Sequence, residues 1–239
     1  MKTEMLSEKN FTTLFKLFWI YVICGVAGYF IETVWCWIDF QEFSSRTSNL
    51  FFPISCVWGL GGVLLYLLTQ RNRWQQNFYI FIKCTVIGTV FEFLCGYLGE
   101  CLFRITFWDY SGMPLHIGKY INVPFCLIWG LLGAVWVRKI YPVINPKLEK
   151  LSKNSFRFMP QMFLSFMICT QVVTGAALLR MHGRQEGRKS SNQIEAVLDY
   201  CFTDETLQGV FPKMKSTVTG EKRLLSAEKA FSLYSMLLS

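Results

Sequence analysis

Long apolar stretches alternate with short polar ones along the first three quarters of the chain. A helix needs about 20 predominantly apolar residues to cross a lipid bilayer. The second and fourth stretches are short for a complete crossing, but we expect each stretch to form a spanning helix. The predicted spans are residues 13–37, 53–68, 78–103, 121–137 and 159–179. The pattern therefore predicts an all-α membrane protein with about five transmembrane helices.

A polar segment follows the last apolar stretch. Residues 1–180 would form a polytopic transmembrane domain, and residues 181–239 a small polar C-terminal tail. Within this tail, residues 221–238 predict one further helix. The low hydrophobicity of the rest is typical of a partly disordered segment.

Two sequence patterns each occur twice in the first four apolar stretches. Gly28–Glu32 and Gly96–Glu100 share G-Y-x-x-E, while Pro53–Gly59 and Pro124–Gly130 share P-x-x-x-x-W-G. Both copies would enter the membrane from the same side, so we expect a parallel two-helix internal repeat. Chance similarity between apolar helices is the alternative. The predicted units are repeat A, about residues 13–68, and repeat B, about residues 78–137.

Composition supports a membrane protein and argues against nucleic-acid binding. Hydrophobic residues make up 52% of the 239 residues and charged residues 17%, whereas soluble domains are about 25% charged. The net charge of +8 comes largely from Lys and Arg in short loops between apolar stretches, where insertion topology requires them. We therefore expect the lipid bilayer as a partner, no nucleic acid, and a location in the plasma membrane.

The distribution of Lys and Arg predicts the orientation. These residues concentrate near the N-terminus, around residue 72 and over residues 138–157, whereas the opposite loops hold only Arg46, Arg104 and Lys119. Because positive residues favour the cytoplasmic side, the N-terminus should be cytoplasmic. The positive residues that follow the last stretch, such as Arg184, run against this assignment.

No sequence pattern for a metal site or for catalysis occurs. The nine cysteines lie mostly inside apolar stretches and form no CxxC pair, and His116 and His182 lie far apart. This arrangement fits no zinc site. Walker A and HExxH sequences are also absent. We therefore predict no metal, no cofactor and no enzymatic activity.

Three glutamates in the apolar stretches are candidates for binding a substrate or an ion. Glu92 lies about 13 Å along the helix from Lys83, near the middle of the membrane. A charged side chain there costs about 3 kcal/mol or more and often marks a transport pathway. A structural hydrogen bond to another helix is the alternative. Glu32 and Glu100 would lie nearer the outer edge, where they either line the same site or pair with arginines of the outer loops.

Further candidates lie at the level of the outer loops. Trp108 and Asp109 belong to an aromatic loop over residues 107–114, and Asn122 precedes the fourth stretch. This loop could be a lid or a substrate-reading surface, or an interfacial anchor in which Asp109 caps a turn. Short segments that begin with proline at matching positions of two halves point to a transporter site. Simple helix starts are the alternative.

These segments resemble the putative ABC-transporter type IV permease family of CmpB-like membrane proteins. The likeness covers about residues 12–215, and Trp108–Ser111 (WDYS) is its most specific part. Phe52 stands where the family tends to have glycine, and Lys213 where it usually has asparagine. The matching segments are residues 28–32, 46–61, 91–93, 100, 107–111, 118–130 and 211–214. The resemblance implies a bacterial multi-span membrane protein, with a separate ATPase subunit as a possible partner.

The leading hypothesis is a membrane transport or permease component for an unknown small substrate or ion, with its site between the repeats. The alternative is a non-transporting membrane sensor or assembly partner that uses the WDYS loop and the tail. An intramembrane enzyme is a third and weaker hypothesis. A water-lined cavity that reaches Glu92 would favour the first hypothesis, and a packed, dry interior the second.

Overall fold

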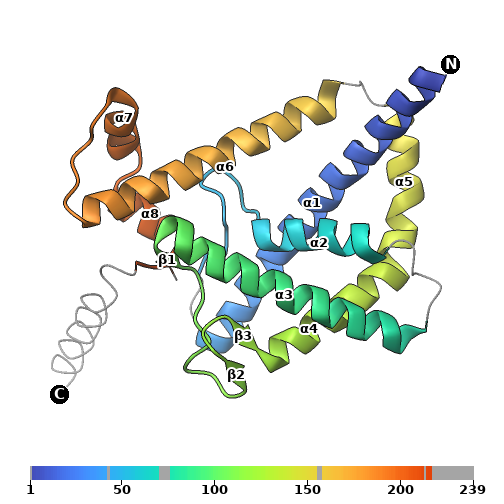
Figure 1. Ribbon diagram of the computed structural model, residues 1–239, viewed down its shortest axis with the longest axis horizontal. Helices are drawn as coiled ribbons and strands as arrows, with labels where there is room; N and C mark the ends of the chain where they lie inside the picture. The colour runs from blue at the N-terminus through green and yellow to red at the C-terminus, as the bar shows by residue number, and fades with distance from the viewer. Residues whose placement is uncertain (1, 42–43, 70–75, 155–157, 213, 217–239) are drawn as a thin grey trace.

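The computed structural model is mostly helical and describes residues 2–41, 44–69, 76–154, 158–212 and 214–216 (Figure 1). The helices are α1 (Lys2–Phe40), α2 (Cys56–Thr69), α3 (Asn77–Phe103), α4 (Val123–Val135), the π-helix η1 (Trp136–Ile140), α5 (Tyr141–Asn154), α6 (Phe158–Gln185), α7 (Gln193–Cys201) and α8 (Asp204–Val210). The strands are β1 (Ile105–Thr106), β2 (His116–Ile117), β3 (Ile121–Asn122) and β4 (Lys215–Ser216), paired β1 with β4 and β2 with β3.

Within the described residues, four helical segments are long and apolar enough to cross a membrane. They are Asn10–Ile38, Asn77–Phe103, Val123–Lys153 and Gln161–Gln185. The chain is therefore a multi-pass membrane protein. The second predicted span is α2, whose 14 residues extend about 21 Å, less than the hydrocarbon core of about 30 Å. The count of five spans thus stays a prediction.

The fourth predicted span was too short. The helix begins near residue 121 as expected, but it continues through α4, η1 and α5 as a segment of 31 residues, Val123–Lys153. The π-helical turn of η1 interrupts the regular hydrogen-bond ladder, which is a common cause of a bend. Figure 1 shows α5 turned away from α4 and lying beside the N-terminal half of α1. An ion pair between Lys16 and Glu149 joins the two helices there.

Helices α1 and α2 form one hairpin, and α3 and α4 form a second. In the first hairpin, Gly28 of α1 faces the side chain of Trp58 of α2. In the second, Gly88 of α3 faces Trp129 of α4 in the same way. Glycine lets the helices approach closely, and the two tryptophan rings meet with centroids 5.3 Å apart. The hairpins therefore contact one another through their tryptophans.

We expect Gly88→Ala to lower the free energy of unfolding by about 1–3 kcal/mol, the usual cost of overpacking. An added Cβ would lie 2.6 Å from the Cβ of Trp129, so rotation of the tryptophan ring cannot relieve the overlap. Titration of the purified protein with a denaturing detergent measures this change. Gly112→Ala is the control, because a Cβ there meets nothing within 4 Å. Equal stability of the two variants would contradict the prediction.

The last span extends beyond its predicted end at residue 179, because its polar end is held by the tail. Arg180 pairs with Glu195 at 3.2 Å and with Asp199 at 2.6 Å. Arg184 pairs with Asp199 and, at 2.6 Å, with Asp204. Hydrogen bonds from Arg180, followed by those from Arg184, lower the pKa of Asp199. Two of the positive residues that conflicted with the predicted orientation, Arg180 and Arg184, are thus ion-paired with the tail.

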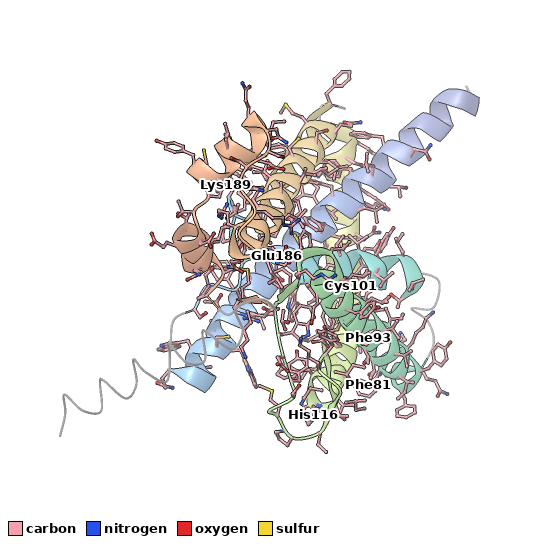
Figure 2. The ribbon with its side chains drawn as sticks, turned by 60° about the vertical axis from the view of Figure 1, so that its left-hand side comes forward. Phe81, Phe93, Cys101, His116, Glu186 and Lys189 are labelled. Carbon is pink, nitrogen blue, oxygen red and sulfur yellow. The ribbon has the colours of Figure 1, made fainter. Side chains whose placement is uncertain are left out.

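The described part of the tail folds against the end of α6. Figure 2 marks that end with Glu186 and the following turn with Lys189. Ile105 of β1 is buried together with Leu207, Phe211 and Met214 of the tail and with α6. The tail is therefore attached to the helices through a small apolar cluster as well as through ion pairs. The helix predicted over residues 221–238 lies outside the described residues.

Candidate functional site

A cavity of about 730 Å³ lies between the two hairpins and α6, and we call it the central cavity. All helices of the two hairpins line it, together with residues of the loops over 44–55 and 104–122. Its polar lining includes Glu32, Arg46, Glu92, Tyr110 and Gln171. The interior is therefore hollow at the level of two candidate glutamates.

Glu92 lies on the inner side of α3, whose course Figure 2 marks with Phe81, Phe93 and Cys101. The residue is 7% exposed, and its Oε1 accepts a hydrogen bond of 2.7 Å from the hydroxyl of Tyr110. The indole of Trp129 also faces this carboxylate. Its Oε2 is buried and has no hydrogen-bond partner among the described residues. One carboxylate oxygen is thus left for a ligand.

Glu32, on α1, has a different environment. Its Oε2 accepts a hydrogen bond from Nε of Arg46 at 3.2 Å, and its Oε1 accepts one from the indole of Trp58. The ion pair with Arg46 confirms one of the two roles expected for Glu32. Both side chains also line the central cavity. Glu32 can therefore pair with Arg46 and still be part of the candidate site.

Aromatic rings form much of the cavity wall. Trp58 of α2 and Trp129 of α4 contact one another, with ring centroids 5.3 Å apart. Tyr110 stacks on Phe125 with a centroid distance of 5.2 Å and an interplanar angle of 19°, and Trp35 meets the same Phe125 edge-on. The wall therefore offers several π faces beside the two carboxylates.

The WDYS loop contributes Trp108, Asp109 and Tyr110 to the lining. Asp109 accepts a hydrogen bond of 3.0 Å from the backbone N–H of Ser111, so it caps a turn, as one of the expected alternatives had it. Burial raises the pKa of Asp109, but the hydrogen bonds from Ser111 lower it further, and the pKa is lowered on balance. Burial, followed by the charge of Glu92, raises the pKa of Tyr110, which keeps its hydroxyl a donor.

Glu100 and Asn122 lie outside the lining of the central cavity. Glu100 accepts hydrogen bonds from Lys119 at 2.6 Å, from Thr106 at 3.2 Å and from Tyr120. Asn122 is buried and donates a hydrogen bond of 2.9 Å to the carbonyl of Pro114. In these positions both residues hold the long loop against α3 and α4.

The sequence reasoning missed the polar face of α6. Gln171 lines the central cavity, donates to the carbonyl of Ser48 at 3.1 Å and accepts from the amide of Asn49 at 3.1 Å. Thr170 accepts from the same amide, and Thr174 accepts from a backbone N–H of the loop. Buried backbone and amide groups need such partners, because an unpaired buried polar group is costly. The signal was the polar spacing T-Q-x-x-T in an otherwise apolar helix.

The described residues contain no group of three or more His, Cys, Asp or Glu side chains arranged to hold a metal ion. The central cavity instead combines two carboxylates, one guanidinium and aromatic walls. Such a mixture can bind a small solute by charge, by hydrogen bonds and by stacking.

Comparison with known proteins gives one finding on the family. No curated protein and no solved structure matches the chain. The model of a protein family described as "putative ABC-transporter type IV" matches residues 19–175. This segment contains the first hairpin from residue 19 of α1 onward, the whole second hairpin, both loops and most of α6. The match covers more than half of the 239 residues, and the chain therefore belongs to the putative ABC-transporter type IV family.

Proposed function

We propose that the protein is a membrane transport component that binds a small solute in the central cavity. The observation that carries this proposal is a cavity of about 730 Å³ that reaches the buried Glu92. Pockets for small molecules typically have volumes of about 300–1,000 Å³. A sensor or assembly partner has no need of a hollow interior with a carboxylate in its wall, so the cavity favours transport.

The proposed site lies between two units of a parallel repeat, the α1–α2 hairpin and the α3–α4 hairpin. In Figure 1, α1 and α3 run toward the same end of the molecule and α2 and α4 return from it. Matching contacts support the repeat, because Gly62 faces Cys24 in the first unit as Gly133 faces Cys84 in the second.

These contacts favour a register different from the one that the G-Y-x-x-E motif suggested. The motif set Gly28 against Gly96, and hence Glu32 against Glu100. Contacts with the two tryptophans instead set Gly28 against Gly88, because each of these glycines faces the tryptophan of its own hairpin. Glu32 then corresponds to Glu92 in the second unit.

In this register the two units supply equivalent half-sites. Each half-site holds a glutamate beside a tryptophan, Glu32 with Trp58 and Glu92 with Trp129. Both glutamates line the central cavity. Transporters built from repeats commonly hold their substrate at the interface between the units, and the paired half-sites are consistent with such a place.

The orientation of the proposed component follows from the charge pattern. With a cytoplasmic N-terminus, the loops over 44–55 and 104–122 lie outside the cell, and the central cavity takes up its solute from that side. We propose the plasma membrane as its location. The family description names an ABC transporter, so a separate ATPase subunit is the proposed source of energy.

Solute profiles of the host cell test this function. A strain that lacks the protein should show a changed distribution of at least one small solute between cells and medium. The wild-type chain should restore the distribution, and Glu92→Gln should fail to restore it at equal membrane abundance, because the variant loses the charge facing the cavity. Glu92→Asp, which keeps the carboxylate, is the control and should restore at least part of it.

Two outcomes would contradict the proposal. An unchanged solute distribution in the deletion strain would point to the sensor or assembly role. Full restoration by Glu92→Gln would remove Glu92 from the transport mechanism and leave it a packing role.

A further inference from the structure

The two half-sites differ in their positive charge. Glu32 is paired with the guanidinium of Arg46 at 3.2 Å. Within the described part of the chain, the hydrogen-bond donors around Glu92 are neutral, since Tyr110 donates to Oε1 and the indole of Trp129 faces the carboxylate. Its Oε2 is buried without a partner among the described residues. As far as the structure describes the chain, the second half-site therefore lacks the cation that the first contains.

We propose that the central cavity binds a small organic cation with N–H donors, a guanidinium or a primary ammonium group, at Glu92. This inference rests on the transport function proposed above and names the class of its substrate. The bound cation would stand against Glu92 as the guanidinium of Arg46 stands against Glu32. The side chain of Arg46 in the first half-site would thus occupy the position that the ligand takes in the second half-site.

The environment of Glu92 favours a cation over other ligands. A carboxylate that is buried without a counter-ion is strongly disfavoured, and an oppositely charged partner with hydrogen bonds relieves this cost. A neutral solute could fill the volume but would leave the carboxylate unneutralised. An anion would add repulsion. The charged residues that line the cavity are the acids Glu32, Glu92 and Asp109 and the bases Arg46 and Lys215. The excess of acids also favours a positive ligand.

The aromatic walls support the same class. Organic cations bind over the faces of Trp, Tyr and Phe rings, most strongly over Trp, at about 6 Å or less from the centroid. Trp58 and Trp129 lie together beside the two carboxylates, and the stacked pair of Tyr110 and Phe125 adds a second wall. A guanidinium group can stack on such a face while its N–H groups bind a carboxylate. An inorganic cation can bind the carboxylate by charge, but it has neither N–H donors nor a planar group that stacks on a ring.

Isothermal titration calorimetry with two probes of nearly equal shape tests the proposal. The full chain, purified in detergent, would be titrated with n-butylguanidinium chloride and with n-butylurea, which differ chiefly in charge. We expect n-butylguanidinium to bind at least ten times more tightly than n-butylurea. Glu92→Gln should weaken binding of n-butylguanidinium at least tenfold. Glu149→Gln is the matched control, because Glu149 of α5 pairs with Lys16 of α1 and lies outside the cavity lining.

The outcomes separate this inference from the transport function. Equal binding of the two probes, unchanged binding in Glu92→Gln, or no binding to a chain that still unfolds cooperatively on heating would each overturn the cation site. Such results leave the transport proposal standing if the deletion strain still shows a changed solute profile. An unchanged solute profile together with charge-dependent binding at Glu92 would overturn transport and keep the cation site.

Discussion

Replacing Arg46 with methionine is expected to lower the free energy of unfolding by about 3 kcal/mol. Removing one member of a buried ion pair typically costs about 3–5 kcal/mol, because the other charge stays buried without a partner. The side chains of Arg46 and Glu32 are 21% and 29% exposed, and they face a cavity rather than bulk water. We therefore expect the lower end of this range. Methionine keeps most of the apolar stem of arginine, so lost packing contributes little.

A double variant distinguishes the loss of charge pairing from a general effect of the substitution. Glu32→Gln combined with Arg46→Met removes both charges, and it should regain at least half of the stability lost in Arg46→Met alone. Detergent-induced unfolding of the purified variants measures both values. Arg188→Met is the control, because Arg188 is 62% exposed and pairs with Glu186 at the surface. If the double variant is no more stable than Arg46→Met, the pair does not account for the cost.

The hydrophobic pattern predicted the ends of a helix well where the whole helix coincides with one apolar stretch of the sequence. The third stretch was predicted over 78–103 and is observed over Asn77–Phe103. The pattern failed where polar residues continue a helix. Helix α6 runs to Gln185, because acids of the tail pair with Arg180 and Arg184. These acids come from later in the chain, so no local pattern could reveal them.

The proposed repeat illustrates a second limit. A short motif such as G-Y-x-x-E fixes spacing within one helix, but not which turn of that helix faces a partner. Gly96 matches the motif and yet packs against Tyr120 and Trp108 of the long loop. Gly88, which the motif ignored, faces Trp129. The loop over 104–122 thus provides a partner for the C-terminal turns of α3.

Only the part of the candidate site that is energetically costly in a membrane could be predicted from the sequence. Glu92 could be picked out from the sequence as a candidate because a carboxylate in an apolar helix is costly and is rare without a partner or a role. Its partner Tyr110 could not, because a loop of undefined course brings that hydroxyl to α3. Gln171 was overlooked for a different reason. Its amide contacts the loop over 44–55, whose depth in the fold is a property of the tertiary structure.

The same loop gives the second large expected effect. Asn49→Leu should lower the free energy of unfolding by about 3 kcal/mol or more. Asn49 is 1% exposed, and its amide donates to Thr170 at 3.2 Å and to Gln171 at 3.1 Å while its carbonyl accepts from the backbone N–H of Phe51 at 2.9 Å. Leucine would leave these buried groups without partners, at about 1–3 kcal/mol for each unsatisfied group.

Thermal unfolding of Asn49→Leu should show a lower midpoint than that of Asn77→Leu, a control at an exposed position at the start of α3. Because Gln171 lines the central cavity, a displaced loop would also change the wall beside Glu92. Asn49→Leu should therefore weaken the binding of n-butylguanidinium, although Asn49 itself lies outside the cavity lining. A variant that keeps wild-type stability would show that water, rather than Asn49, satisfies the polar groups of α6, and the loop would then be held by its backbone bonds alone.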